Sequence, residues 1–373
     1  MKILVTGGAG FIGSYIVEAL LTDGNEVRIL DNLEKQVHSG KLSSYMGKIM
    51  ENDKVEFMEG DVRKRETLEK ALEGVETIFH EAAMVGVGQS MYEIDKYVEV
   101  NTKANALLLD ILANKEHSVK KLVVAASMSS YGEGSYKCEK HGEVCVNLRS
   151  EEQLSRKKWE QTCPICGKEV EPVPTKETHM QKPTSLYALT KKQQEEMSIM
   201  IGKAYGIPTV ALRYFNVYGP RQSLSNPYTG VMAIFASRLK NGNPPVVFED
   251  GNQTRDFVNV RDIAQANMLA MKKSSADYKT FNVGTGNPRK IKEIALLLAK
   301  LYKKKIKPTI TKTFRKGDIR HCFADVSALE GIGYAPKVDF EEGVKELIEW
   351  SDGEQAVDKF DSAMEELKSR GLA

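Results

Sequence analysis

The segment Lys2-Ile-Leu-Val-Thr-Gly-Gly-Ala-Gly-Phe-Ile-Gly13 sets the fold class that we expect for this chain. Residues 3–5 have the apolar run of a buried parallel strand, and residues 11–21 repeat apolar side chains at helical spacing. The glycines between them allow a tight turn, close approach of the backbone to a pyrophosphate, and close packing of helix on strand. The helix N-terminus adds N–H donors and partial positive charge. The segment therefore predicts a dinucleotide-binding turn, formed by Gly7, Gly10, Phe11, Ile12 and Gly13.

An acidic residue follows the second predicted strand. Residues 26–30 form a strand pattern that ends at Asp31, and Asn32 comes directly after it. The carboxylate of Asp31 is placed to accept a hydrogen bond from a ribose 2′-hydroxyl and to repel a 2′-phosphate. The sequence therefore favours NAD over NADP as the cofactor, with Asp31 and Asn32 among its contacts.

Three further strand patterns, at residues 55–58, 77–80 and 121–126, alternate with stretches that fit crossover helices. We therefore expect an α/β protein with a Rossmann-type, doubly wound parallel sheet. Ligands bind beyond the carboxyl ends of such strands. Further cofactor contacts are therefore predicted at Asp61, Val62, His80, Ala82 and Ala83. A loop cap is the alternative for Asp61 and Val62, and a hydrogen-bonded core position is the alternative for His80.

Length and composition are those of an ordinary globular protein with one large or two coupled domains. The 373 residues are 41% hydrophobic and 28% charged, with a net charge of +2. This near balance provides no field to recruit nucleic acid or an acidic membrane, and no stretch reaches transmembrane length. The chain enters a strand pattern directly, without a targeting segment. We therefore expect a cytoplasmic protein with reduced thiols, and neither nucleic acid nor a membrane as a partner.

Tyr187 and Lys191 stand four residues apart in a predicted helix. Positions with this spacing share one helix face, so a cation beside the phenol would favour its ionised form and make it a usable base. Upstream, the serine-rich turn Ser-Met-Ser-Ser-Tyr-Gly at residues 127–132 follows the strand pattern 121–126. Its hydroxyl groups are therefore expected at the edge of the sheet where the cofactor would bind.

The glycine turn, the acidic strand end, the serine-rich turn and the Tyr-x-x-x-Lys pair occur in an order that resembles the extended short-chain dehydrogenase/reductase family. Within it, the chain resembles the NAD-dependent sugar-nucleotide epimerases and dehydratases, over nearly its whole length except a cysteine-rich interval. The resemblance implies Tyr187 as general base, Lys191 as its activator and a ribose ligand, and Ser127 as the partner hydroxyl. It also implies Ser129 as an auxiliary group and Asn101 as a support of the active-site helix near the cofactor. A helix cap is the alternative for Asn101.

The same resemblance implies a smaller α/β domain that binds a nucleotide-diphosphate sugar. Asn216 and Val217 follow a strand pattern and would touch the nucleotide diphosphate. Arg255 would bind phosphate through two N–H donors. Arg315 would add a second cation, and Asp318 an acid suited to a ribose hydroxyl.

The implied chemistry is oxidation of a sugar carbon followed by return of the hydride. Tyrosinate takes the hydroxyl proton while hydride leaves the same carbon for the nicotinamide, and return to the opposite face of the keto sugar inverts the centre. A 4,6-dehydratase of the family would carry Asp-Glu where this chain has Met128-Ser129, so dehydration is disfavoured and 4-epimerisation is expected. Val85 stands where classical galactose epimerases carry a lysine, which weakens an assignment to UDP-glucose and UDP-galactose. A sugar oxidoreductase and a non-catalytic NAD-binding regulator are the alternatives.

The cysteine-rich interval contains four of the five cysteines. Cys138-Glu-Lys-His-Gly142 and Cys163-Pro-Ile-Cys-Gly167 share the form Cys-x-x-(Cys/His)-Gly, which suits tetrahedral zinc. The parallel glycines favour four structural ligands: Cys138, His141, Cys163 and Cys166. Cys145 is the alternative fourth ligand, and redox-active or unliganded thiols are the alternative states. Cysteine-bearing insertions at this place resemble a subset of nucleotide-sugar epimerases that includes the dTDP-L-rhamnose 4-epimerases.

These patterns divide the chain into four parts. We expect an NAD-binding domain at 1–137 and 176–215, a zinc-knuckle-like insertion at 138–175, a nucleotide-sugar-binding domain at 216–350 with strands returning to the first sheet, and a C-terminal helix within 351–373. The insertion lies between the serine and the tyrosine of the site, so we expect a flap over the sugar pocket or a platform for a neighbouring subunit. The family resemblance also implies a two-fold homodimer built from helix pairs.

Overall fold

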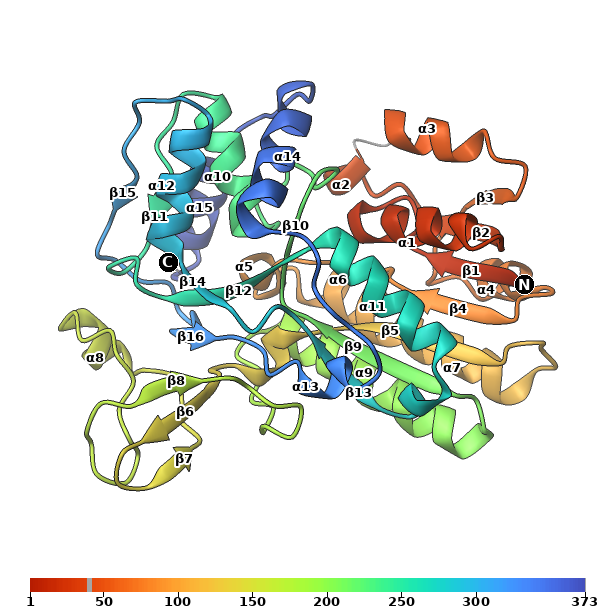
Figure 1. Cartoon of the computed structure of the whole chain (residues 1–373), viewed down its shortest axis with the longest axis horizontal. Coiled ribbons are helices and arrows are strands. Elements are labelled where there is room, and N and C mark those ends of the chain that lie inside the picture. Colours follow the sequence, from red (N-terminus) through yellow and green to blue (C-terminus); the bar gives the residue numbers. More distant parts are fainter. Residues whose placement is uncertain (39–41, 373) are drawn as a thin grey trace.

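The computed structural model describes residues 1–38 and 42–372 and contains a seven-stranded sheet (Figure 1). Its strands are β1 (Lys2–Thr6), β2 (Glu26–Asp31), β3 (Val55–Glu59), β4 (Thr77–His80), β5 (Lys121–Ser127), β9 (Thr209–Tyr214) and β13 (Thr280–Val283). All neighbours are parallel, in the order β13-β9-β5-β4-β1-β2-β3. The chain runs outward from β1 to β3 and then returns through β4 to the other side. The predicted doubly wound sheet is confirmed, and ligands of such sheets bind where the order reverses.

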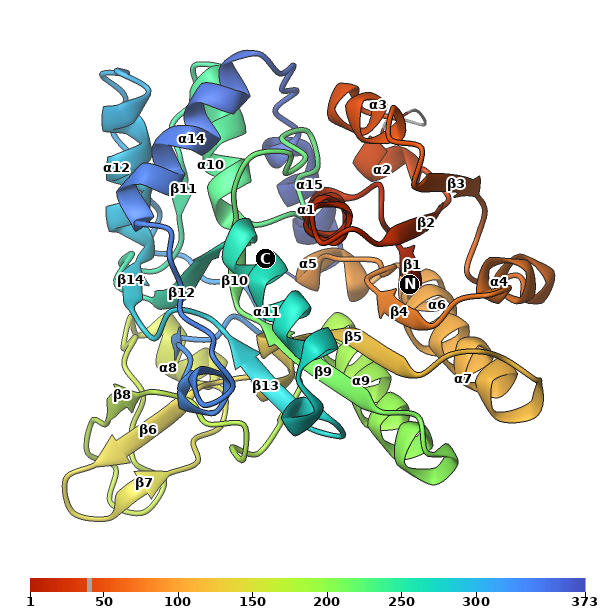
Figure 2. The ribbon, with the colours of Figure 1, turned by 45° about the vertical axis from the view of Figure 1, so that its right-hand side comes forward.

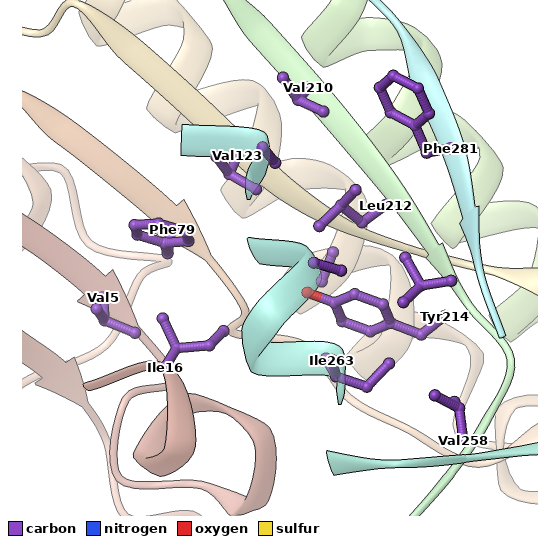
Figure 3. Close-up of a cluster of buried hydrophobic side chains, with 14 of the residues drawn as sticks. Val5, Ile16, Phe79, Val123, Val210, Leu212, Tyr214, Val258, Ile263 and Phe281 are labelled. Carbon is purple, nitrogen blue, oxygen red and sulfur yellow. The ribbon is translucent and has the colours of Figure 1, made fainter. Parts of the chain in front are cut away.

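Alternate side chains of these strands pack against two helical layers. One layer contains α1 (Phe11–Thr22), α3 (Ser44–Met50) and α11 (Val260–Lys272), and the other contains α4 (Arg65–Leu72), α7 (Ala104–Asn114) and α9 (Leu186–Tyr205). Val5 and Phe79 pack with Ile16 of α1 on the first face, as Figure 3 shows. Leu4 packs on the opposite face, because successive strand residues point in opposite directions.

Short elements connect the strands and layers. They are α2 (Lys35–His38), α5 (Val87–Ser90), α6 (Ile94–Tyr97), the π-helical turn η1 (Val98–Lys103), and the 3-10 turns η2 (Met128–Tyr131) and η3 (Ser274–Ala276). Within the described part of the chain, no helix has both the length and the apolar character needed to cross a bilayer.

A second, smaller unit lies beside the parallel sheet (Figures 1 and 2). Its strands are β10 (Asn216–Tyr218), β11 (Val246–Val247), β12 (Thr254–Asn259), β14 (Pro288–Lys290), β15 (Thr309–Ile310) and β16 (His321–Cys322). Its helices are α10 (Val231–Lys240), α12 (Ile291–Leu301) and α14 (Phe340–Asp352). The short helix α13 (Ser327–Glu330) packs instead on the core that contains Val5 and Phe79. The last helix is α15 (Phe360–Ser369). Buried Phe235, Leu298 and Val344 join the three longer helices into a separate core. β13 comes from the range 216–350 and pairs with β9 of the parallel sheet.

The cysteine-rich insertion folds as its own three-stranded antiparallel sheet, in the order β7-β6-β8. It contains β6 (Ser135–Cys138), β7 (Gly142–Val144), α8 (Glu151–Ser155) and β8 (Glu171–Val173), and Figure 1 shows it apart from the helical layers. Its sheet begins at Ser135, slightly before the predicted boundary. Buried Arg149 fastens it to the second unit, because both terminal nitrogens donate to the carboxylate of Glu249 at 2.9 Å.

Candidate active site

A cavity of about 620 Å³ lies at the carboxyl edge of the parallel sheet and extends into the second unit. It brings together most of the predicted residues: Gly7, Gly10, Phe11, Ile12, Gly13, Asp31, Asn32, Asp61, Val62, Ala82, Ala83, Ser127, Ser129, Tyr187, Lys191, Asn216, Val217, Arg255, Arg315 and Asp318. Two residues predicted to contact the cofactor, His80 and Asn101, are not part of its wall. The carboxyl ends of parallel strands meet at one edge, so residues far apart in sequence share this cavity.

The glycine turn has the geometry of a dinucleotide cradle. Gly7 has a φ of +69°, and a Cβ at this position would lie 2.9 Å from the backbone nitrogen of Ala82. A Cβ on Gly13 would lie 2.2 Å from the carbonyl oxygen of Gly7, so α1 can approach the turn this closely only with glycine. No side chain caps the start of α1, which leaves its first N–H groups for a ligand. The cradle therefore fits a pyrophosphate.

Asp31 is held rigidly at the end of β2. Its Oδ2 accepts from the N–H of Ala9 at 3.1 Å, and its Oδ1 accepts from the N–H of Leu33 at 2.9 Å. A carboxylate oxygen has further lone pairs, so the group can still accept from a ribose hydroxyl. Asp61, after β3, is instead paired with Arg63 at 2.6 Å at the rim of the cavity.

His80 lies in the core and not in the cavity wall, where a cofactor contact was predicted. The ring is completely buried, its Nδ1 lies 2.8 Å from Thr6 Oγ1, and burial lowers its pKa to about 3. It is therefore a neutral core histidine. Asn101 is also buried behind the wall, where its amide bonds to the backbone of Met84 and to Thr190 Oγ1. It ties α9 to the segment after β4, which agrees with a supporting role and argues against direct cofactor contact.

Ser127, Tyr187 and Lys191 meet in the cavity. Ser127 ends β5, and the other two residues lie in the first turns of α9, which begins after the capping residue Ser185. The Oγ of Ser127 accepts from the N–H and the hydroxyl of Ser129 at 3.2 and 2.9 Å. Its own proton therefore remains available for Tyr187 or for a substrate oxygen.

The pKa of Tyr187 differs from the prediction. Burial raises the pKa of this phenol, and the hydrogen bond from Ser127 opposes the rise only in part. Lys191 Nζ donates to Gln194 Oε1 at 2.6 Å, and burial lowers the pKa of Lys191 to about 8. Helical spacing does place the lysine on the correct face. A desolvated cavity, however, disfavours both an ammonium and a phenolate, and this effect outweighs the attraction expected between them.

Glu81 is a site residue that the sequence reasoning missed. It follows β4, lines the cavity, and accepts a hydrogen bond from the Tyr214 hydroxyl at 2.9 Å. Burial raises its pKa to about 7, although Tyr214 and Lys191 favour the carboxylate. Side chains alternate in direction at a strand end, so the alternative interpretation of His80 as a core residue was the available signal that Glu81 lines the cavity.

We expect Glu81→Gln to alter the pH dependence of stability. The pKa of Glu81 rises on folding from 4.5 to about 7, so the folded state binds this proton more tightly and loses stability as the pH rises through that interval. Glutamine does not titrate, so the free energy of unfolding of the variant should rise relative to that of the wild type by roughly 1–3 kcal/mol between about pH 5 and about pH 8. Urea unfolding of both nucleotide-free proteins at the two pH values measures the difference. A constant difference would show that Glu81 is ionised throughout.

The second half of the cavity contains amides with free acceptors. The side-chain oxygens of Asn216, Gln222 and Gln253 are buried without a hydrogen-bond partner among the described residues, and all three residues line the cavity. Buried acceptors are normally satisfied, so a ligand with hydroxyl or N–H donors fits here. Gln222 and Gln253 were not predicted, because no spacing or motif distinguishes them from other surface amides.

The predicted phosphate and ribose contacts lie in the same half. Arg255 donates to three backbone carbonyl oxygens at 2.7 to 3.0 Å, which fixes the plane of its guanidinium at the cavity wall. Arg315 Nε donates to Asp318 Oδ2 at 2.9 Å. This pair therefore forms one unit on the wall, and Asp318 is already engaged by Arg315.

The cysteine-rich insertion brings four ligand atoms within 4.8 Å of one another. Cys138 Sγ lies 3.5 Å from His141 Nδ1 and 3.8 Å from Cys166 Sγ, and Cys163 Sγ lies 3.4 Å from His141 Nδ1. Tetrahedral zinc, with Zn–S of about 2.3 Å and Zn–N of about 2.0 Å, separates two sulfurs by about 3.8 Å and sulfur from nitrogen by about 3.5 Å. The cluster therefore fits zinc. Cys145 is exposed and lies outside it, which favours His141 as the fourth ligand.

The two halves of the cluster repeat one local structure. Burial alone would raise the pKa values of Cys138 and Cys163, but backbone N–H groups two and three residues further on lower both thiol pKa values overall. Gly142 and Gly167 follow with φ values of +72° and +71°. The repeated glycine in the sequence therefore marks a pair of matching turns, and each turn directs a cysteine sulfur toward the same point.

The glycine cradle, the acid after β2 and the Ser-Tyr-Lys group define a dinucleotide-binding protein of the extended short-chain dehydrogenase/reductase type. The sequence profile of the NAD dependent epimerase/dehydratase family matches residues 3–158 and 159–284. The chain therefore belongs to the NAD dependent epimerase/dehydratase family, as the resemblance in sequence implied.

Known relatives support this placement. A dTDP-L-rhamnose 4-epimerase from Burkholderia thailandensis is 33% identical over 352 residues, which cover 94% of each chain. The crystal structure of a UDP-glucose 4-epimerase from Thermotoga maritima with UDP-glucose has a TM-score of 0.76 and 31% identity, covering 94% of this chain and 99% of that one. A UDP-glucose 4-epimerase from Thermus thermophilus in complex with NAD has a TM-score of 0.72 and 31% identity, covering 95% and 100%.

Proposed function

We propose that this protein is an NAD-dependent nucleotide-sugar 4-epimerase. The observation that carries the proposal is the meeting of Ser127, Tyr187 and Lys191 in one cavity with a dinucleotide cradle. The buried acceptors of Asn216 and Gln253 at the other end suit the hydroxyl and N–H donors of a nucleotide sugar. The Thermus and Thermotoga relatives, described with NAD and with UDP-glucose, add support.

The side chains of the cavity divide the chemistry among them. Bound NAD would accept a hydride from the sugar carbon and later return it. Tyr187 is placed to remove the proton of the sugar hydroxyl, and Ser127 can donate to the same oxygen. Lys191 would favour the tyrosinate and hold the cofactor ribose when its ammonium turns from Gln194. Inversion follows when the keto sugar presents its opposite face before reduction.

Epimerisation is favoured over loss of water by the residues beside Ser127. Dehydration across two carbons needs an acid and a base near the sugar. Met128 and Ser129 occupy the positions where a dehydratase of the family carries an acidic pair, and the Ser129 hydroxyl is used to support Ser127. A sugar oxidoreductase remains the second candidate, because its half-reaction needs the same three residues.

Incubation with UDP- and dTDP-linked sugars, without added cofactor, should invert C4 of at least one sugar with no net reduction of NAD. Nuclear magnetic resonance of the product identifies the inverted carbon. In deuterated water C4 should stay free of deuterium, because the same hydride returns to it. Turnover that depends on added NAD or NADPH would instead identify an oxidoreductase, and loss of water a dehydratase.

We also propose one structural zinc ion at Cys138, His141, Cys163 and Cys166. The agreement of three interatomic distances with a zinc tetrahedron supports this ligand set. Thiolate ligands require reduced cysteines, and the cytosol keeps thiols reduced. The zinc site is therefore consistent with a proposed cytoplasmic location.

A two-fold homodimer is proposed through the helices around α9. Apolar side chains stand exposed along this surface, including Ile94 of α6 at 55%, Leu189 of α9 at 42% and Met200 of α9 at 65%. α7 and α9 pack side by side, so pairing with a second copy would form a bundle of four helices. A dimer interface here would bury these exposed side chains, and exposed apolar patches mark interaction surfaces.

A further inference from the structure

The C-terminal helix α15 forms part of the cavity wall. Its apolar stripe of Phe360, Ala363, Met364 and Leu367 lines the same cavity as Tyr187. The opposite face, which includes Asp361 and Glu365, is exposed to solvent. A helix with this spacing normally covers a packed core, whereas here the stripe borders the space in which a ligand would lie.

The end of α15 lies on the side of the cavity that holds the catalytic tyrosine. Leu367 covers Gly88 of α5, where an added Cβ would lie 3.3 Å from the leucine methyl carbons. In the same short helix, Ser90 Oγ accepts from the backbone N–H of Tyr187 at 3.0 Å. Figure 2 shows α15 between α10 and α5. The helix therefore borders the cavity close to the start of α9.

A second contact leads to the same place. The carbonyl oxygen of Leu372 accepts from the N–H of Lys316 at 3.4 Å. In the adjoining turn, Gly317 O accepts from the hydroxyl of Thr184, which lies just before α9. The C-terminal segment therefore contacts two segments that lie beside the start of α9. These are α5, through Leu367, and the turn at Lys316, through Leu372.

The two ends of α15 are attached differently. At its start, buried Arg238 of α10 pairs with Asp358 at 3.3 Å and Asp361 at 3.0 Å, and its guanidinium lies over the Phe360 ring. At its other end, contacts with the first unit are apolar or weak, such as Arg370 over the Tyr92 ring at 4.5 Å. Charged contacts therefore hold the start of α15, and mainly apolar contacts hold its end.

We propose that α15 covers the bound sugar and that Met364 and Leu367 contact it as specificity-determining residues. This inference rests on the proposed epimerase function. An apolar wall suits a sugar with an apolar substituent, such as a 6-deoxyhexose, and offers no partner to a uronate carboxylate, whose burial without a counterion is costly. Nearby wall cations do not supply that partner, because Lys96 pairs with Glu34 and Arg315 with Asp318. The closed helix also retains the keto sugar until hydride returns.

The test compares Met364→Gln and Leu367→Gln with wild type, using a 6-deoxyhexose and a hexuronic acid linked to the same nucleotide. Wild type should favour the 6-deoxy sugar in kcat/KM by about tenfold or more, and each variant should reduce that preference by about tenfold. Glu365→Gln, on the exposed face of the same helix, is the matched control and should leave the preference unchanged. Met364 is only partly buried, so its variant is expected to fold, which thermal unfolding checks.

Nicotinamide absorbance of the same full-length variants provides the second measurement. With a weaker apolar contact between α15 and the sugar, each variant should release some keto sugar during turnover and accumulate reduced nicotinamide. An unchanged preference in both glutamine variants, or a wild type that favours the uronate, overturns the inference but leaves epimerisation standing. Failure of wild type to epimerise any nucleotide sugar overturns the proposed function itself, and the inference with it.

Discussion

Replacing Tyr187 with phenylalanine should lower kcat by about 10³-fold while bound NAD is retained. Phenylalanine keeps the ring, which packs edge-on against Tyr97 with centroids 6.5 Å apart, so the cavity should keep its shape. The substitution removes only the oxygen that would accept the proton of the sugar hydroxyl. Epimerisation rates at saturating nucleotide sugar, with the nucleotide content of the denatured protein, measure both parts of the prediction.

Tyr205→Phe is the matched control for this experiment. Tyr205 ends the same helix but is 54% exposed and lies outside the cavity, so its loss should change kcat by less than about twofold. If Tyr187→Phe kept more than about a tenth of the activity, Tyr187 would not be the general base. Glu81, whose carboxyl also lines the cavity, would then be the next group to test.

Replacing Cys163 with serine should reduce bound zinc from about one ion per chain to less than about 0.2, because serine is a poor zinc ligand. The insertion has only a small core of its own: Tyr136, Cys138, Val144, Val146, Cys163 and Val170. Cores of this size rarely hold a fold without a metal or a disulfide. We therefore expect rapid proteolytic cleavage within the insertion of this variant, together with the loss of metal measured by atomic emission.

The same variant should affect substrate binding. Arg149 of the insertion is paired with Glu249, which lines the cavity, so disorder of the insertion removes one of the two arginine partners of this buried carboxylate and leaves only Arg320. KM for the nucleotide sugar should rise several-fold. Cys145→Ser is the control, because Cys145 is exposed and outside the cluster, and it should keep both zinc and KM. Full zinc retention by Cys163→Ser would contradict the ligand set.

Local spacing explains which of the predicted residues the structure brings together. Gly7 and Gly13 are required by a positive φ and by a close backbone approach, which depend on neighbouring residues within a single turn. Tyr187 and Lys191 share a helix face for the same local reason. The two Cys-x-x-(Cys/His)-Gly turns each orient their own cysteine and histidine side chains, so the cluster could be predicted from the sequence.

Predictions that depended on burial or on strand parity were less secure. His80 was expected beside the cofactor, but its ring bonds to Thr6 and Glu81 takes the position at the cavity. Neighbouring residues at a strand end point in opposite directions, one into the core and the other toward the cavity. An apolar run in the sequence does not tell which of the two points toward the cavity. The pKa of Tyr187 was expected to fall, yet desolvation of the cavity raises it. The pKa shift depends on how deeply the phenol is buried, and this burial depends on the packing of the whole structure. The spacing of residues along a helix carries no information about it.

The doubly wound sheet, the glycine turn, the Ser-Tyr-Lys set and the Cys/His cluster were predictable from sequence, because each is built from short local motifs or from the order in which such motifs occur in the family. The folded structure was needed to show that Glu81, Gln222 and Gln253 line the cavity, and that residues of α15 line it too. It also decided that Arg149 meets Glu249, a pair separated by 100 positions in the chain. Such contacts arise from the packing of whole elements and the exclusion of water between them, so no local pattern records them.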